Sequence, residues 1–239
     1  MTYTAADLQR DLAEIASMSV GPKPTDPIPM VLWEMSRTHL ALMKNWIQIY
    51  KPEFQQFHTS APIDDTENYI GFALAWISIV YAHHQLEDEV QFPVWSKYVD
   101  MSANEAEHEK MLPPLREFEA YLKSVLAGDF TWDASKAEAL AQEFFPPLAH
   151  HYVAELYTLT PEVLIKGGYT PEESAATFAK VAMRGKEILD PARDVVPLLL
   201  HNDGATDFPP VPWTITKEWK MPQELYDAHK GWWKYAPPQ

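Results

Sequence analysis

Long segments of helical periodicity dominate this chain, and they limit its fold more than any other feature of the sequence. Apolar residues recur at the spacing of a helix face, whereas the alternation typical of β-strands is scarce. The 21 prolines stand mostly between these segments and mark their ends. The pattern therefore predicts an all-α protein of long helices joined by proline- and glycine-containing turns.

The expected helices follow one another along most of the chain. They cover about residues 4–18, 29–50, 67–97, 102–127, 134–159 and 170–189. Ser102 and Glu105 form the pattern of a capping box, and Thr170 before Pro171 is a second start signal. Pro113-Pro114 and Pro146-Pro147 are expected to kink or interrupt the helices that contain them.

The composition excludes several classes of site and partner. Cysteine is absent, which rules out disulfides, zinc ribbons, iron–sulfur clusters and thiol nucleophiles, so a bound metal must take nitrogen and oxygen ligands. A formal charge of −15 repels a phosphate backbone, and no basic stripe serves anionic lipid. The longest apolar window, residues 69–82, is too short to span a bilayer, and residues 2–19 lack a secretory signal pattern. We therefore expect a cytoplasmic protein without nucleic-acid or membrane partners.

Two similar motifs place a histidine four residues before a glutamate. They are His83 with Glu87 and His151 with Glu155, and each glutamate is followed six residues later by a proline. Four residues advance about 400° around a helix, so the imidazole and the carboxylate of each pair share one face. Single histidines on two other helices, His39 and His108, complete four imidazoles and two carboxylates. That set suits two metal ions, with iron favoured over manganese and zinc because no thiolate is present.

Each of these residues also has an ordinary structural interpretation. A lone histidine on an apolar helix is more often a hydrogen-bonded core residue than a ligand. Neighbours on a helix differ by about 100°, so we expect one of His83 and His84, and one of His150 and His151, to face the site. The acidic side chains near these histidines are most simply a solvated face, or else one orients an imidazole; they are Asp88, Glu89, Glu105, Glu107 and Glu109.

The sequence resembles the hemerythrin-like (HHE cation-binding) family. The resemblance rests on His83-His84-x-x-Glu87, followed by Phe92-Pro93, and on the order of the other motifs between about residues 30 and 161. It implies an up-and-down four-helix bundle over residues 28–165. The residue pattern adds an N-terminal helix, additional helices over 166–200 and an aromatic, proline-rich tail over 201–239 that wraps the bundle, and we expect a single domain over residues 1–239. The resemblance also implies the ligand set; by position, this is His39, His83, Glu87, His108, His151 and Glu155.

The chain departs from the oxygen-carrying members of that family on the third helix. Those proteins have two histidines four residues apart there, whereas the positions that flank His108 at that spacing are Asn104 and Leu112. The vacancy could be filled by His84, His150 or Glu107, or by water. Ferritin-like di-iron bundles are a poorer match, because they place glutamate before histidine.

Three functions fit this interpretation. The leading hypothesis is a non-haem di-iron enzyme that activates dioxygen to oxidise or oxygenate a small organic substrate, with the help of an electron donor. The alternative is a binding protein that carries, stores or senses oxygen or iron without turnover. A metal-free bundle is the third, and it would leave several buried polar groups without partners. The oligomeric state is left open.

Overall fold

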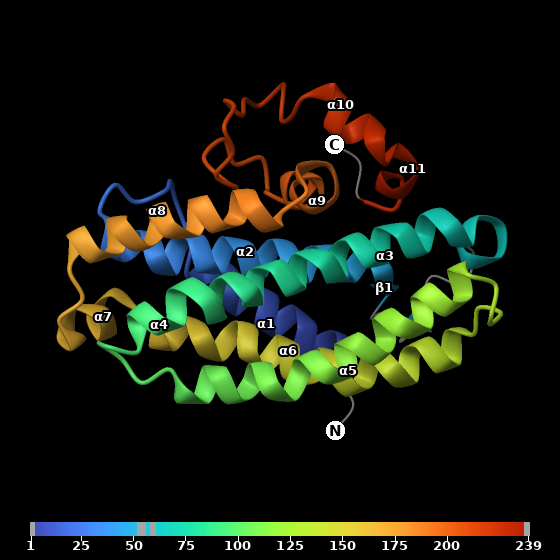
Figure 1. Cartoon of the computed structure of the whole chain (residues 1–239), viewed down its shortest axis with the longest axis horizontal. Coiled ribbons are helices and arrows are strands. Elements are labelled where there is room, and N and C mark those ends of the chain that lie inside the picture. The colour runs from blue at the N-terminus through green and yellow to red at the C-terminus, as the bar shows by residue number, and fades with distance from the viewer. Residues whose placement is uncertain (1–2, 52–55, 58–60, 237–239) are drawn as a thin grey trace.

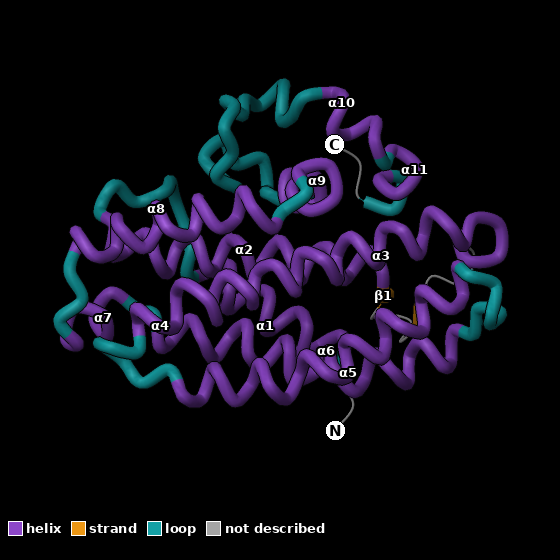
Figure 2. Tube along the Cα trace, in the orientation of Figure 1, coloured by secondary structure: helices purple, strands orange, loops and turns teal. Residues whose placement is uncertain are grey.

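The computed structural model describes residues 3–51, 56–57 and 61–236, and it is almost entirely helical (Figures 1 and 2). Its α-helices are α1 (Ala5–Ser17), α2 (Pro27–Ile49), α3 (Ala61–Leu86), α4 (Phe92–Trp95), α5 (Ser102–Leu126), α6 (Ala134–Thr158), α7 (Pro161–Gly167), α8 (Pro171–Ile188), α9 (Val196–Leu200), α10 (Gln223–Ala228) and α11 (Lys230–Trp233). Two π-helical segments, η2 (Glu87–Gln91) and η3 (Pro191–Val195), link α3 to α4 and precede α9. The strands β1 (Tyr50–Lys51) and β2 (Gln56–Phe57) form one short antiparallel pair. The expectation of an all-α protein is confirmed.

Four long helices form the body of the molecule. Helices α2, α3, α5 and α6 run in alternating directions, as the colour gradient of Figure 1 shows. Helix α5 packs along α6, and α3 contacts both α2 and α5. The short segment 127–133 between α5 and α6 places these two helices side by side and antiparallel.

An aromatic layer lies two turns from the histidines along the bundle. Residues seven apart on a helix share a face and are separated by about 10 Å. Trp46 is seven residues after His39, whereas Trp76 and Phe144 are seven residues before His83 and His151, on helices of the opposite direction. The indoles of Trp46 and Trp76 lie 4.8 Å apart, and Trp46 meets Phe144 at 5.4 Å between ring centroids. The antiparallel arrangement thus stacks one apolar layer beside one polar layer.

Further helices cover parts of this body. Helix α1 packs against α2 and α6, and α8 packs against α2 and α3. The start of α8 is capped as expected, because the N–H of Glu173 donates to Oγ1 of Thr170 at 3.2 Å. Gly128, in the left-handed region at φ 80°, follows the end of α5, where glycine is the residue that most easily adopts this conformation.

Two local predictions are wrong, namely an interruption of α5 and α6 at their proline pairs and a capping box at Ser102. Helices α5 and α6 continue through Pro113-Pro114 and Pro146-Pro147. In α5 the carbonyls that lose a donor belong to Glu109 and Lys110, which are exposed, so solvent can replace the missing hydrogen bonds. The expected capping box is also absent: Ser102 is the first helical residue, and Asp100 accepts from its N–H at 3.0 Å.

The C-terminal segment lies against α3 and η3 (Figure 1). The indole of Trp232 packs directly over Gly71, where a Cβ atom would lie 2.2 Å from its nitrogen. Asp65 accepts a hydrogen bond from the Tyr235 hydroxyl at 2.7 Å and forms an ion pair with Lys234. These contacts join the aromatic tail to the bundle.

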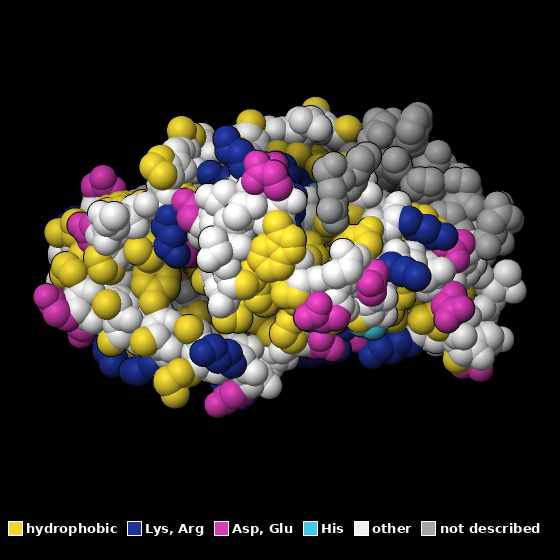
Figure 3. Space-filling model, turned by 90° about the horizontal axis from the view of Figure 1, so that it is seen from above, with side chains coloured by type: hydrophobic (Ala, Val, Ile, Leu, Met, Phe, Trp, Pro, Cys, Tyr) yellow, Lys and Arg dark blue, Asp and Glu magenta, His cyan; other side chains and the backbone are white. Residues whose placement is uncertain are grey.

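Charged side chains are dispersed over the face of the molecule that Figure 3 shows, where basic side chains alternate with acidic and apolar ones. Among the described residues, none of the helices combines the length and the apolar character that crossing a bilayer requires.

Candidate metal centre

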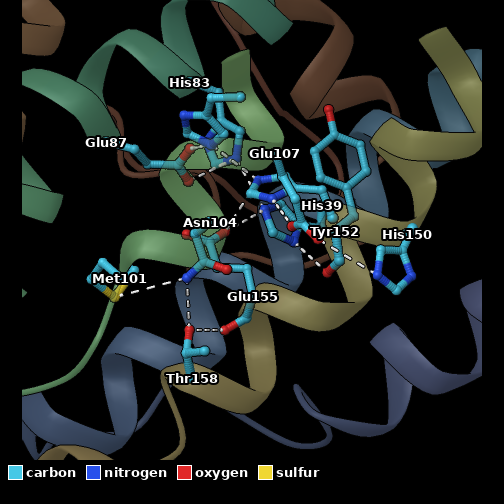
Figure 4. A network of polar contacts seen from close by, with 12 residues as sticks. His39, His83, Glu87, Met101, Asn104, Glu107, His150, Tyr152, Glu155 and Thr158 are labelled. Carbon is cyan, nitrogen blue, oxygen red and sulfur yellow. Dashed lines mark hydrogen bonds and ion pairs between the residues drawn. The ribbon is translucent and has the colours of Figure 1, made fainter. Parts of the chain in front are cut away.

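Seven buried donor residues on α2, α3, η2, α5 and α6 converge inside the bundle. Figure 4 labels four of them, which are His39, His83, Glu87 and Glu155. The ligand atoms of the seven residues form two groups, each with all atoms within 4.8 Å of one another. The first group is His39, His83, Glu87 and Glu155, and the second is His84, Glu87, His108 and His151. The most exposed of the seven is His83, at 9%. All six donors expected from the sequence are therefore brought together, and His84 joins them.

Glu87 belongs to both groups. Its Oε1 lies 3.0 Å from Nε2 of His83, in the first group, whereas its Oε2 lies 3.5 Å from Nε2 of His108, in the second. Oε2 of Glu155 also stands between the groups, at 3.4 Å from Nε2 of His39 and 3.8 Å from Nε2 of His151. Two carboxylates thus lie where they can bridge a pair of cations.

The spacing of the donors fits coordination to ions. Nitrogen and oxygen ligands about 2.1 Å from an ion and at right angles to one another are about 3.0 Å apart. Nε2 atoms face each other at 3.0 Å between His39 and His83, and at 3.1 Å between His108 and His151. The donor contacts around Glu87 and Glu155 span 3.0–3.8 Å. A cation between these atoms would satisfy them together.

In four of the imidazoles, Nδ1, the ring nitrogen that points away from the centre, faces a hydrogen-bond acceptor. Nδ1 of His39 lies 2.8 Å from the carbonyl oxygen of Tyr152, and Nδ1 of His84 lies 2.7 Å from that of Val80. Nδ1 of His108 meets a carboxylate oxygen of Asp88 at 2.8 Å, and Nδ1 of His151 meets one of Glu107 at 3.0 Å. Each acceptor requires the proton on Nδ1, which leaves Nε2 with a lone pair directed at the centre. This arrangement is typical of histidines that bind metals.

The inner oxygen atoms lack hydrogen-bond donors. Among the described residues, neither carboxylate oxygen of Glu87 or Glu155 has a hydrogen-bond partner, and Nε2 of His84 has none either. Nε2 of His39, His108 and His151 cannot donate to these oxygens, because the protons of these three rings are on Nδ1. Buried polar groups without partners are costly, so the set of residues fits a bound cation better than an apolar interior.

Burial sets the protonation states of the metal-free site. It raises the pKa of Glu155 to about 8, with a further contribution from the charges of Glu107 and Asp88. The pKa of Glu87 is raised by burial and then by Glu155. Burial also lowers the pKa of His39 to about 3 and those of His83, His84 and His151 well below the usual value. The imidazoles are thus neutral, which is the form that binds metals.

The pairs of neighbouring histidines behave differently. His150 lies on the outer side of α6 with 73% of its side chain exposed, and its Nε2 is 3.5 Å from Glu107 (Figure 4). Only His151 of that pair reaches the centre. The expectation that one of His83 and His84 faces the site is wrong, because both do. The two donor groups lie on either side of Glu87, so side chains about 100° apart on α3 each reach one of them.

The acidic residues are divided between two roles. Glu107 and Asp88 each accept a hydrogen bond from an imidazole. From the sequence, this orienting role was only the lesser alternative for the acidic residues. Glu107 is therefore placed beside His151 Nδ1 and outside the two donor groups. Glu105 and Glu109 are exposed, as a solvated face predicts. The spacing of Asp88 and Glu107 from the histidines carried no distinctive signal.

Tyr152 is a buried neighbour that sequence reasoning did not single out. Its ring lies 4.4 Å from that of His39, between centroids, and stands parallel to that of His84 at 6.1 Å. Its hydroxyl is buried and has no hydrogen-bond partner among the described residues. The ring forms one wall of the centre, and burial together with the nearby glutamates raises its pKa.

Comparison with protein-family models, with curated proteins and with solved structures finds no match to this chain. The site is therefore interpreted from its own geometry and from the sequence motifs that form it.

Two adjoining hollows open beside the centre, where α5 faces the end of α3 and the η2 and α4 segments that follow it. The larger, of about 710 Å³, reaches His108, and the smaller, of about 430 Å³, reaches His84. Both are lined by Asp88, Leu112 and Arg116, so they form one groove, which we call the α3–α5 groove. Among residues 201–236, the described part of the C-terminal tail, none lines either hollow.

Proposed function

We propose that this protein is a hemerythrin-like, non-haem di-iron protein that binds dioxygen and activates it to oxidise or oxygenate a small organic substrate. The observation that carries the proposal is the position of Glu87, with one carboxylate oxygen in each of two buried donor groups. A carboxylate with one oxygen in each donor group is better placed to bind two ions than to bind a single ion.

The donor types support iron. The first group has two imidazoles and two carboxylates, and the second has three imidazoles and the shared carboxylate. Such mixed nitrogen and oxygen sets suit iron, with manganese and zinc as competitors. Four donors leave positions open on an octahedral ion, where dioxygen can bind.

Two bound ferrous ions would supply two electrons and Lewis acidity toward dioxygen. The substrate or an electron donor supplies the other electrons. The protein's own residues hold the imidazoles neutral and oriented through Asp88, Glu107 and the carbonyls of Val80 and Tyr152. The α3–α5 groove offers space for a small molecule beside His108.

The deep burial of the centre favours one second candidate. His39, Glu87, His151 and Glu155 are fully shielded from solvent, which also suits a protein that carries, stores or senses oxygen or iron without turnover. The two candidates share the same metal centre and differ in the fate of dioxygen.

Two measurements test the proposal. Crystals of iron-loaded protein, measured at the iron absorption edge, should show two anomalous peaks between the seven donors; one peak, or none, contradicts a di-iron centre. The reduced, loaded protein is then mixed with air. Oxygen consumption that depends on an added organic substrate and reductant supports the enzyme, whereas a stable spectrum that reverses when oxygen is removed supports the carrier.

A further inference from the structure

The α3–α5 groove is an open approach to the proposed centre. In Figure 1 the seam between α3 and α5 faces the viewer without another described element across it, whereas α1 and α8 pack against other sides of the bundle. His108 lines the larger hollow and His84 lines the smaller one. Both histidines belong to the second donor group, so this group lies next to the groove.

The groove presents carboxylates at its mouth. Glu105 and Glu109 line the larger hollow, both are exposed, and neither forms an ion pair with another described residue. Asp88 lies where the two hollows meet and contacts Nδ1 of His108. Carboxylates are thus spaced from the surface to the first imidazole.

A buried, unpartnered donor lies at the inner end. His84 is 1% exposed, its Nδ1 meets the carbonyl of Val80, and its Nε2 has no hydrogen-bond partner among the described residues. An imidazole nitrogen with a free lone pair, such as Nε2 of His84, can bind a cation that reaches it. The carboxylates outside and the imidazole inside therefore point to the same kind of ligand.

Arg116 is the opposing charge. It lines both hollows and places a guanidinium within the path. Charges that line a cleft raise the local concentration of ions of the opposite sign and lower that of ions of the same sign. The glutamates and Arg116 should thus change the rate of cation entry in opposite directions.

We propose that the α3–α5 groove is the entry route for divalent metal ions, in which Glu105 and Glu109 capture the hydrated cation and pass it by Asp88 to His84 and His108. This inference rests on the metal centre of the proposed function and not on its oxygen chemistry. It assigns a role in the rate of metal uptake to Glu105, Glu109 and Asp88, which bind no metal in the loaded protein.

The test is the rate at which metal-free protein takes up Co²⁺, followed by the visible absorption of the bound ion. At low salt, the double variant E105Q/E109Q should load about three- to tenfold more slowly than the original chain, and Arg116→Gln about two- to threefold faster. Glu117→Gln is the matched control, since Glu117 is an exposed carboxylate on the same helix that lines neither hollow. At high salt the differences should shrink, because salt screens exposed charges.

The equilibrium number of bound ions separates the two proposals. It should be the same in all four proteins, because none of these substitutions removes a donor. Equal loading rates in the double variant, the Arg116 variant and the original chain, with full occupancy, would overturn the entry route and leave the centre intact. A chain that binds no metal at equilibrium would overturn both. Opposite shifts for the two charge types cannot come from a general loss of structure.

Discussion

The Nε2 atoms of His108 and His151 lie 3.1 Å apart inside the bundle, and the other nitrogen of each ring faces a carboxylate. The protons are therefore on Nδ1, so two lone pairs face each other. Nδ1 of His39 and Nδ1 of His84 each face a backbone carbonyl, so the Nε2 atoms of these two rings also carry lone pairs. A cation is the partner that turns this repulsion into attraction.

Metal removal should destabilise the protein. An ion that binds only the folded chain adds about 2.7 kcal/mol at 100 times its dissociation constant, which raises the midpoint of thermal unfolding by about 5–11 °C for a chain of this size. Calorimetry of protein treated with a chelator, before and after addition of Fe²⁺ without air, measures the difference. Identical midpoints would count against a metal centre.

His84 and His150 each stand next to a predicted ligand in the sequence, so their alanine variants form a matched pair. His84→Ala should lose at least one of two bound ions, because His84 is one of four donors in the second group. His150→Ala should keep both, since His150 points outward from α6. Metal analysis by mass spectrometry after removal of free ions measures the content. Equal metal content in the two variants would contradict the assignment of His84 as a metal ligand.

Loss of the hydrogen bond to His151 should weaken the centre without removing a donor. Glu107→Ala should lower metal affinity about 10–100-fold, the size found for partners that orient metal-binding histidines. Glu107→Gln should lie between the alanine variant and the original chain, because an amide oxygen still accepts from Nδ1. Competition with a coloured chelator gives the affinities. An alanine variant as tight as the original chain would show that Glu107 has no orienting role.

Substitution of two helical glycines by alanine should change the free energy of unfolding in opposite directions. Gly71→Ala places a Cβ atom against the indole of Trp232, so we expect a loss of about 1–3 kcal/mol in unfolding free energy. Gly185→Ala meets only Leu189, at an ordinary 3.6 Å, and should gain about 0.5–1 kcal/mol because alanine favours helix. Urea denaturation measures both changes. A neutral Gly71 variant would show that Trp232 does not pack there in solution.

The contact between Trp232 and Gly71 also shows what sequence reasoning could not reach. The tail was expected to cover the bundle because it is rich in aromatic residues, but the pattern named no surface for it. A tryptophan fits over a glycine 161 residues earlier only because the chain folds back on α3. The continuation of α5 and α6 through their prolines was missed for a similar reason, since propensity does not record whether solvent or packing compensates for a lost hydrogen bond.

The helices and the candidate donor residues on them could be predicted from the sequence. Helical period is a local property, so the spacing of His83 from Glu87 and of His151 from Glu155 was enough to place each pair on one face. Only the tertiary structure decided that His84 joins His108 and His151, that Glu87 divides its oxygens between two groups, and that Asp88 and Glu107 orient imidazoles. These relationships depend on the rotation of each helix about its axis and on the distances between helices, which are set by side-chain packing across the whole core.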